Sequence, residues 1–418
     1  MTDNQRYEAA KEIYAELGVD TDAALRKMSD KKISIHCWQG DDGIGFENRK
    51  ERINTGIMAT GNYPGRARNG EELRSDISKA MELIPGKHKF NLHSIYAETN
   101  GKCVERDELR YEYFEGWVSW AKDKGIGLDF NPTIYNHPNM EEGYSLSSPD
   151  PAVRAFWIRH TEECREIADR IGAELGQKCV NNIWISDGSK DNCINKAELR
   201  ATLKNSLDEI FKAQYSAKHM VDALEPKLFG IGTESFVVGS LEFYLSYALL
   251  NKKLLCLDMG HFHPTELVSD KISSILTFSD ELLLHVSRGV RWDSDHVVAY
   301  NEELQSVFNE INRAQAFSKV NIALDFFDAS INRVGAWVIG ARNTLKAILV
   351  SLLEPVELLR KVEREGDWAS RLGYLEELKS LPFGAVWDRY CEMNGVPVRD
   401  KWIAKMRDYE KKVLSLRG

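Results

Sequence analysis

Short apolar runs alternate along this chain with longer segments whose apolar residues recur at helical spacing. The apolar runs are ISIHCW (33–38), KFNLHS (89–94), IGLDFN (126–131), NNIWIS (181–186), HMVDAL (219–224), LLCL (254–257), ELLL (281–284) and VNIAL (320–324). Runs of branched or bulky apolar residues are typical of strands buried on both faces. Helical patterns cover 3–28, 106–123, 151–173, 196–216, 239–251 and 297–316. Eight strands separated by helices predict an α/β fold, a (β/α)8 TIM barrel whose active site lies at the carboxyl ends of the strands.

The pattern changes after residue 354. Two charged stretches with heptad-like apolar spacing follow, LLRKVEREGDWASRLGYLEELKSL and WDRYCEMNGVPVRDKWIAKMRDYEKKVLSL. We therefore divide the chain into a barrel with an N-terminal helix (1–354) and a helical C-terminal extension (355–418). Long helical tails often wrap a neighbouring subunit, although they also pack on their own barrel. We expect the extension to take part in subunit contacts.

The last four apolar runs each end on a residue that can bind a divalent cation. These residues are Glu225, Asp258, His285 and Asp325, at intervals of 33, 27 and 40 residues. His261 follows Asp258 by three residues, and an Asp293-Ser294-Asp295 segment lies just after His285. One charged residue at a strand end is ordinary, but four in succession indicate a metal site at the mouth of a barrel.

The charge of this set explains why cations are needed. Five carboxylates, those of Glu225, Asp258, Asp293, Asp295 and Asp325, carry a formal charge of −5. Crowded together without cations they would repel one another and some would stay protonated. Two divalent ions and the neighbouring Lys227 bring the balance to about zero. Carboxylate oxygens suit Mg²⁺ and Mn²⁺, and imidazole shifts the preference toward Mn²⁺, Co²⁺ or Zn²⁺. The alternative is a set of separate surface acids, strand caps and helix N-caps.

Composition narrows the class of protein. A chain of 418 residues exceeds the usual single core of about 250–300 residues, which agrees with a barrel plus an appendage. The net charge of −9 argues against a nucleic-acid partner. Seven scattered cysteines without a C-x-x-C pair indicate reduced thiols. The N-terminus lacks the apolar core of a signal peptide, and Arg342 and Lys346 interrupt the longest apolar stretch, so we expect a cytoplasmic protein without a membrane partner.

The chain resembles the L-rhamnose isomerase family over nearly its whole length, including the candidate ligands above. The segments that carry the resemblance are IHCWQGDD (35–42), ATGNYPG (59–65), FNLHSIYAE (90–98), LDFNPT (128–133), WISDG (184–188), LEPKLFGIGTES (224–235), CLDMGHFHPTE (256–266), RWDSDH (291–296) and ALDFFDASINR (323–333). The resemblance implies a metal-dependent aldose–ketose isomerase of rhamnose catabolism, on a barrel like that of xylose isomerase. It also implies a homotetramer and the interconversion of L-rhamnose and L-rhamnulose.

The resemblance also assigns ligands to two cations per subunit, with Mn²⁺ the leading ion and Co²⁺, Zn²⁺ or Mg²⁺ as alternatives. One cation, which also grips the substrate's hydroxyls, would be held by Glu225, Asp258, His285 and Asp325. The second, where the hydrogen moves, would be held by His261, Asp293 and Asp295, with Asp258 as a bridge. None of these seven positions departs from the family pattern.

Isomerisation of an aldose requires ring opening, loss of the O2 proton and polarisation of the C1 carbonyl, and a divalent ion serves the last two. In a dry site we favour a metal-assisted hydride shift from C2 to C1. The alternative is proton transfer through an enediol, with a water held by Asp325 as the base. The family match places Lys227 near the carbonyl, where it would stabilise negative charge on O1. We take Lys227, Asp325 and His261 as the catalytic residues.

The family match also suggests a substrate pocket. Its residues would be His93, Trp184, Ile57, Ile95, Tyr96 and Phe327, the last four suited to the C6 methyl group of a 6-deoxy sugar. Simpler readings stay open for several residues. Trp184 suits a buried core, His93 could bind a backbone carbonyl, and Lys227 could merely pair with a strand-end acid. We read His263 as facing away from the site, His296 as a helix-start residue, and Asp41 and Asp42 as loop acids.

Two other functions fit a barrel with clustered acids and histidines. One is a divalent-metal phosphodiester hydrolase, which would want a third metal and a basic groove for phosphates; the charge of −9 counts against it. The other is a non-catalytic, metal-stabilised sugar-binding protein. Lys227 beside Glu225 and a complete second ligand set favour the isomerase.

Overall fold

Eight parallel strands close into a barrel, as the sequence predicts. The computed structural model of the chain describes residues 2–47, 59–140 and 143–417. Around the barrel the strands follow the order β1-β10-β9-β8-β6-β4-β3-β2, and each neighbouring pair is parallel. Their bounds are β1 (Ile33–His36), β2 (Lys89–His93), β3 (Leu128–Asn131), β4 (Cys179–Ile183), β6 (Met220–Leu224), β8 (Leu254–Asp258), β9 (Leu282–Val286) and β10 (Val320–Leu324). Each predicted strand is therefore present, with ends shifted by no more than three residues.

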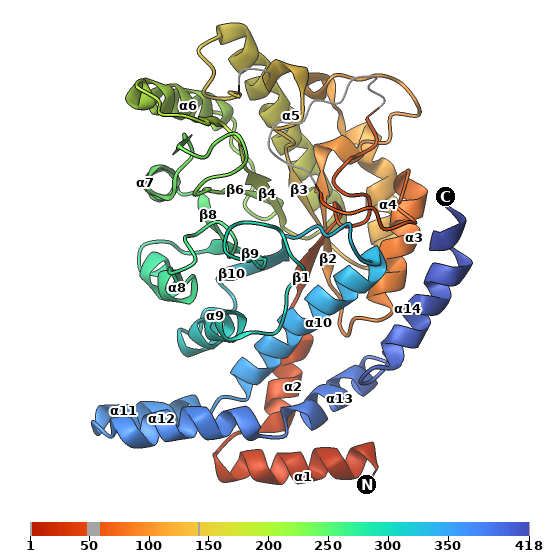
Figure 1. Cartoon of the computed structure of the whole chain (residues 1–418), viewed down its shortest axis with the longest axis vertical. Helices are drawn as coiled ribbons and strands as arrows, with labels where there is room; N and C mark the ends of the chain where they lie inside the picture. The colour runs from red at the N-terminus through yellow and green to blue at the C-terminus, as the bar shows by residue number, and fades with distance from the viewer. Residues whose placement is uncertain (1, 48–58, 141–142, 418) are drawn as a thin grey trace.

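One helix follows each barrel strand and covers it from outside (Figure 1). These helices are α3 (Gly70–Met81), α4 (Glu115–Lys124), α5 (Pro151–Leu175), α6 (Lys196–Ile210), α7 (Leu241–Asn251), α8 (Ser269–Leu276), α9 (Glu302–Arg313) and α10 (Arg333–Leu352). The helix α5 shows how local sequence fixes the bounds. The Asp150 side chain accepts a hydrogen bond from the backbone N–H of Ala152, Pro151 occupies the first turn, and Gly176 ends the helix in the left-handed region.

Several predicted helix boundaries are wrong. The predicted helix 3–28 is two helices, α1 (Asp3–Glu16) and α2 (Thr21–Ser29), because Gly18 takes a positive φ of 77° and Asp20 caps a new helix. The segment 106–123 starts as two short 3-10 turns, and only α4 is α-helical. The predicted helices 196–216, 239–251 and 297–316 are shorter than expected. In the last case the Asn301 side chain accepts from the Leu304 N–H, so the helix starts at 302.

Three of the barrel helices, α3, α8 and α10, lie outside the predicted segments. The reason is clearest for α10, in which fifteen of twenty residues are buried on several faces of the helix. A helix that is apolar on most sides has no polar face and therefore no clear period. Two short antiparallel strands, β5 (Gly188–Ser189) and β7 (Phe236–Val237), were also not predicted; they join the loops that follow β4 and β6.

The C-terminal segment forms four helices, because each of the two charged stretches is broken once. They are α11 (Val356–Arg364), α12 (Trp368–Glu377), α13 (Phe383–Met393) and α14 (Lys401–Lys412). Gly366 and Gly395 take positive φ angles of 73° and 66° at the two breaks. In Figure 1 this segment runs from the base of the barrel past α1 and up one side.

The last two helices of this segment are fastened to their own barrel. Arg6 of α1 donates to Asp388 of α13 at 3.2 Å. The Tyr409 hydroxyl of α14 donates to Asp76 of α3 at 2.7 Å, and Arg417 pairs with the same carboxylate. By contrast, α12 has no buried residue and leaves Trp368 57% and Leu372 59% exposed.

A small apolar cluster fills the inside of the barrel, apart from the main core between strands and helices. Its fully buried members come from five barrel strands: Val180, Ala223, Leu254, Cys256, Leu283 and Ala323. Side chains packed inside a barrel of this size leave no channel, so the site above them has a closed floor.

Within the described ranges, no single helix has the length and apolar character needed to cross a membrane. The helices α10 and α11 meet the requirement only as a pair, bent by 54° at their junction.

Candidate metal and active site

Four predicted ligands meet at the carboxyl ends of neighbouring strands. Glu225 and Asp325 directly follow β6 and β10, while Asp258 and His285 are paired in register on β8 and β9. One ligand atom from each of the four lies within 4.8 Å of the others. The Nδ1 atom of His285 lies 3.1 Å from Asp325 Oδ2, 3.4 Å from Glu225 Oε2 and 3.6 Å from Asp258 Oδ2. Three carboxylates and an imidazole so arranged form a ligand set for one divalent cation.

Neighbouring groups hold two of these carboxylates in place. Asp258 Oδ1 accepts hydrogen bonds from the Ser287 hydroxyl at 2.7 Å and from the Gly260 N–H at 2.6 Å. The Asn182 amide donates to Glu225 Oε2 at 2.5 Å. Contacts of this kind fix the direction of a ligand's remaining lone pairs.

Asp325 is oriented from the neighbouring strand β1, which pairs with β10. The indole N–H of Trp38, two residues beyond β1, donates to Asp325 Oδ1 at 3.0 Å. The second carboxylate oxygen of Asp325, Oδ2, faces His285.

Sequence reasoning missed all four orienting residues: Ser287, Gly260, Asn182 and Trp38. Trp38 ends a predicted strand, which is the signal that revealed the ligands, whereas Asn182 is near a carboxyl end only in the observed strand β4. Their side chains are neutral, however, so charge gave no hint of their role.

The residues predicted for the second cation lie beside the first set. His261 Nε2 is 3.2 Å from Asp293 Oδ2, and its Nδ1 is 3.2 Å from Glu225 Oε1. The Lys227 ammonium donates to the same Asp293 oxygen at 2.7 Å, and Asp295 lines the same cavity. Across the described part of the chain, His261, Asp293 and Asp295 do not form a closed ligand set like the first. The structure brings the predicted residues together, with Lys227 placed among them.

Electrostatics in this cluster favour added positive charge. Burial alone would lower the pKa of His261, but the charges of Asp258 and Asp293 raise it to about 10. The pKa of Lys227 is likewise raised, because Asp293 and Asp295 outweigh its burial. Burial and the nearby Asp293 charge raise the pKa of Asp295 well above its usual value. A site that draws protons onto imidazole and carboxylate is chemically suited to divalent cations, so the residues fit the group that the sequence implies.

A cavity of about 290 Å³ opens above the cluster. Glu225, His261, His285, Asp293 and Asp325 form its polar wall, and its other described lining residues include Trp38, His93, Tyr135, Trp184, Lys227, Trp292 and Phe327. The Lys227 Nζ lies 5.1 Å from the Trp184 ring centroid. The indole N–H of Trp184 is buried and has no hydrogen-bond partner among the described residues. A polyol the size of a hexose fits a cavity with one polar and one aromatic wall.

Two residues predicted for the pocket lie elsewhere, and a third cannot be placed. Ile95 is buried beneath the loop at Gly45, where it would meet any added Cβ at 2.7 Å, and does not line the cavity. Tyr96 is also buried, and its hydroxyl donates to Asp41 Oδ1 at 2.6 Å. Both side chains support the loop after β1 rather than form the cavity wall. Ile57 falls outside the described residues.

The histidines His263 and His93 have different outcomes: His263 follows its simpler reading, whereas His93 lines the cavity. His263 is exposed and hydrogen-bonds Thr265 at 2.7 Å, facing away from the cavity. His93 lines the cavity with its Nδ1 3.1 Å from Thr133 Oγ1, and burial lowers its pKa to about 3, so the ring is neutral.

The two loop acids near β1 have structural contacts. Asp41 accepts from two backbone N–H groups and Tyr96, and its burial raises its pKa to about 7. Asp42 pairs with Arg333 at 2.7 Å. His296 differs from its expected role, because it lies in the bridge to Arg288, ahead of α9, and lines the cavity.

The family model and the relatives found by sequence agree over nearly the full chain. The model of the family described as L-rhamnose isomerase (RhaA) matches residues 1–417. The L-rhamnose isomerase of Rhodopirellula baltica is 54% identical over 99% of this chain and 96% of that protein. That of Listeria monocytogenes serovar 1/2a is 51% identical over 98% of each. Among solved structures, D-psicose 3-epimerase from Clostridium cellulolyticum H10 aligns with a TM-score of 0.46 and 13% identity, over 77% of this chain and 97% of that one.

Proposed function

This chain belongs to the L-rhamnose isomerase family and is an aldose–ketose isomerase, and from that premise we propose that it interconverts L-rhamnose and L-rhamnulose. The observation that carries the proposal is the position of Lys227. Its ammonium group and the metal-type ligand cluster face one sugar-sized cavity. An aldose bound there would have an ammonium and cation ligands on the same side as its reacting carbons.

We further propose that the chain binds two divalent cations, with Mn²⁺ as the preferred ion. Glu225, Asp258, His285 and Asp325 would hold one, and the contacts that orient Asp258, Glu225 and Asp325 support this set. His261, Asp293 and Asp295 would hold the other together with Asp258. Mixed carboxylate and imidazole ligands favour Mn²⁺ over Mg²⁺. The cations, when bound, supply Lewis acidity toward the carbonyl and lower the pKa of the neighbouring hydroxyl.

In this reaction Lys227 would stabilise negative charge that develops on O1. The charges of Asp293 and Asp295 outweigh the burial of its amine and raise its pKa, so it keeps its proton. A fixed ammonium in a dry site acts on developing charge more strongly than one in water. Asp325, held by the Trp38 indole, would orient the group at C2. The aromatic walls exclude water, which favours a hydride shift from C2 to C1 over exchange of a proton through an enediol.

Recognition of the sugar would divide between the two walls of the cavity. Phe327 and Trp38 offer apolar surface to a C6 methyl group, while the partnerless Trp184 indole offers a donor to a hydroxyl oxygen. Contacts of one methyl or hydroxyl change substrate preference by about 10–200-fold. Turnover of related aldoses at lower efficiency is therefore expected.

We propose that the protein is a homotetramer. Two groups of exposed apolar side chains support subunit contacts. One is on α12, with Trp368 and Leu372, and the other borders the cavity, with Ile231 57% and Trp292 41% exposed. Light scattering of the purified chain should give a mass close to four times 47.6 kDa. A monomeric mass would contradict the tetramer without touching the proposed reaction.

We also propose that the enzyme acts in the cytoplasm, in the catabolism of rhamnose. All seven cysteines are free thiols, which suits a reducing compartment. The two other functions weighed from the sequence, a phosphodiester hydrolase and a non-catalytic sugar-binding protein, receive no support from the family match or from the relatives.

The test is a ketose assay on chelator-treated protein with L-rhamnose as substrate, before and after addition of Mn²⁺. We expect conversion to L-rhamnulose only after the metal is restored. Turnover of another aldose but not of L-rhamnose would change the substrate and leave the mechanism. Absence of turnover with any aldose in metal-loaded protein would refute the proposed function.

A further inference from the structure

A thiol lies directly against the metal cluster. Cys256 sits two residues before Asp258 on β8 and is fully buried as part of the apolar cluster inside the barrel. Its Sγ, a ring nitrogen of His285 and a carboxylate oxygen of Glu225 all lie within 4.8 Å of one another. Of the two candidate ligand sets in the described residues, one therefore contains sulfur and the other does not, and they share Glu225 and His285.

We propose that Glu225, Cys256 and His285 form a second binding position for a soft divalent cation such as Cd²⁺ or Zn²⁺, beneath the one used in catalysis. The inference builds on the proposed metal site but needs no turnover. A cation bound there would take its sulfur ligand from the floor of the site. Cations in the two positions would exclude each other, because the positions share two ligands.

The chemistry of the donors separates the two positions. Three carboxylates and one imidazole favour hard or borderline ions, whereas thiolate favours soft ones. A thiophilic ion that enters through the cavity would contact Glu225 and His285 first, and then bind Cys256, which lies below them. As the metal–sulfur bond forms, the thiol proton leaves to solvent and the charge of the cation replaces it. No oxidant or reductant is required.

Two buried polar atoms, one on the shared ligand His285 and one on Asn182 next to Glu225, have no partner among the described residues and point to a ligand in this cluster. The Nε2 atom of His285 has no hydrogen-bond partner in the described part of the chain, although the residue is only 1% exposed. The Oδ1 atom of Asn182, whose amide donates to Glu225, is likewise buried without a partner among those residues. Buried polar atoms are rarely left unpaired in folded proteins. An ion bound through the unpartnered His285 nitrogen would supply the partner that this atom lacks.

A purely structural reading of Cys256 makes a different prediction. If the thiol only fills space among Val180, Ala223 and Leu254, its sulfur never contacts a metal. Serine in its place would then change packing but not the ligands of any cation. The two readings differ in a spectroscopic property of bound Cd²⁺ and can be separated without measuring activity.

The experiment is a titration of metal-stripped full-length protein with Cd²⁺, followed by the ultraviolet charge-transfer band of a cadmium–thiolate bond. We expect the band to saturate at one Cd²⁺ per chain in the wild type and to be lost in Cys256→Ser. Preference for Cd²⁺ over Mn²⁺ should fall by about 10–100-fold in the variant. Cys103→Ser removes the exposed thiol and Cys179→Ser a buried strand thiol outside both ligand sets, and both should keep the band.

Retention of the band in Cys256→Ser, or Cd²⁺ binding by the wild type without a band, would overturn the inference. If the serine variant fails to fold by circular dichroism, Cys256→Ala is the second variant, with the same loss expected. Cadmium NMR of the wild type tests the claim with no substitution at all: a resonance with only oxygen and nitrogen ligands contradicts it. Loss of isomerase activity alone would bear on the proposed function and not on this site.

Discussion

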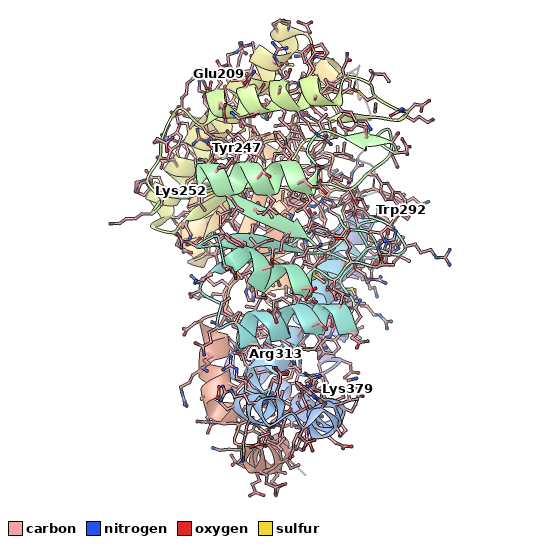
Figure 2. All side chains as sticks on the ribbon, turned by 90° about the vertical axis from the view of Figure 1, so that its left-hand side faces the viewer. Glu209, Tyr247, Lys252, Trp292, Arg313 and Lys379 are labelled. Carbon is pink, nitrogen blue, oxygen red and sulfur yellow. The ribbon has the colours of Figure 1, made fainter. Side chains whose placement is uncertain are left out.

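Buried carboxylates occur at both ends of the barrel, but among the described residues only those at one end are paired with enough cationic side chains to be neutralised. Toward the amino ends of the strands, Asp222 pairs with Arg165 at 3.0 Å and with Lys253 at 2.9 Å. The buried Asp129 pairs with Lys89, and the half-buried Glu281 pairs with Lys178 at 2.6 Å. The two ends are far apart: in Figure 2, Trp292 at the cavity mouth and Lys252 beside β8 mark opposite edges of the molecule.

At the mouth of the barrel the balance is different. Among the described residues, one ammonium serves this cluster: that of Lys227, which donates to Asp293. The cluster holds the five carboxylates of Glu225, Asp258, Asp293, Asp295 and Asp325. The remaining excess of negative charge raises the pKa values of His261 and His285. The comparison teaches that burial of acids alone does not mark a functional site. A cluster of acids with too few cationic partners among the described residues marks it, because such a cluster is stabilised by cations from outside the chain.

The sharpest test of this contrast removes one charge at the mouth. Asp293→Asn should abolish the second cation site and lower kcat/KM by at least about a thousandfold, since both the cation and the anchor of Lys227 are lost. The free energy of unfolding should change little. Metal content by mass spectrometry, the ketose assay and a denaturant titration check this. Normal metal content with retained activity would refute the two-cation assignment.

The matching substitution near the amino ends of the strands should lower stability and leave metal binding unchanged. Asp222→Asn leaves Arg165 and Lys253 without their shared anion, and the free energy of unfolding should fall by about 3 kcal/mol. Metal content and kcat should remain near wild type at temperatures where the variant is folded. A loss of metal with unchanged stability would mean that the two ends of the barrel are coupled, contrary to the comparison.

In the wild type, protons should compete with cations for the ligands at the mouth of the barrel. Because the pKa of His261 is raised to about 10, the ring is protonated at neutral pH and must lose its proton to bind a cation. Affinity for Mn²⁺ should therefore rise by about tenfold per pH unit between about pH 7 and pH 9.

The same shift has a consequence for stability. A folded-state pKa above the unfolded value of about 6.5 stabilises the metal-free chain fully below that pH, and this contribution is lost as the pH rises through about 10. Calorimetric titration at several pH values measures the affinity, and thermal melts measure the stability. The exposed His263→Gln is the control that should keep the slope, and His261→Gln should remove it. A flat affinity profile in the wild type would contradict the assignment of His261 as a ligand.

A steric test sharpens the geometry of the mouth. A Cβ on Gly260 would lie 2.8 Å from Asp293 Oδ1 and 3.0 Å from Ser287 Oγ. Gly260→Ala should displace Asp293 or Asp258 and weaken Mn²⁺ binding by about tenfold. Gly384→Ala, with nothing within 4 Å of its Cβ, is the matched control and should behave as wild type. Equal Mn²⁺ affinity in both variants would mean that the aspartates can move freely.

The smallest effect expected is at Trp38. Trp38→Phe keeps an aromatic wall but removes the N–H that donates to Asp325. We expect a loss of up to about tenfold in kcat, with KM nearly unchanged, because Asp325 keeps its contact with His285. Steady-state kinetics with L-rhamnose check this. A change in KM alone would indicate that Trp38 acts through the cavity wall.

Periodicity was sufficient for the barrel strands, because a strand buried on both faces leaves an uninterrupted apolar run. Helix boundaries were harder to predict. The amphipathic pattern continues past the helix break at Gly18 and past the helix cap at Asn301, so the pattern alone does not show these boundaries. The helix α10 has no polar face, so it has no amphipathic pattern that would reveal it. The ligand candidates were recognisable because each is charged or an imidazole and stands at a strand end.

The sequence by itself determined the order of the strands, the family, and the set of charged residues at the carboxyl end of the barrel. Only the tertiary structure decided which neutral groups orient those residues, that Ile95 and Tyr96 support a loop instead of lining the cavity, and that Cys256 reaches the metal cluster from below. The reason is physical. Charge and periodicity are properties of residues along the chain, whereas the direction of a hydrogen bond or a buried thiol depends on the register of strands that lie far apart in sequence.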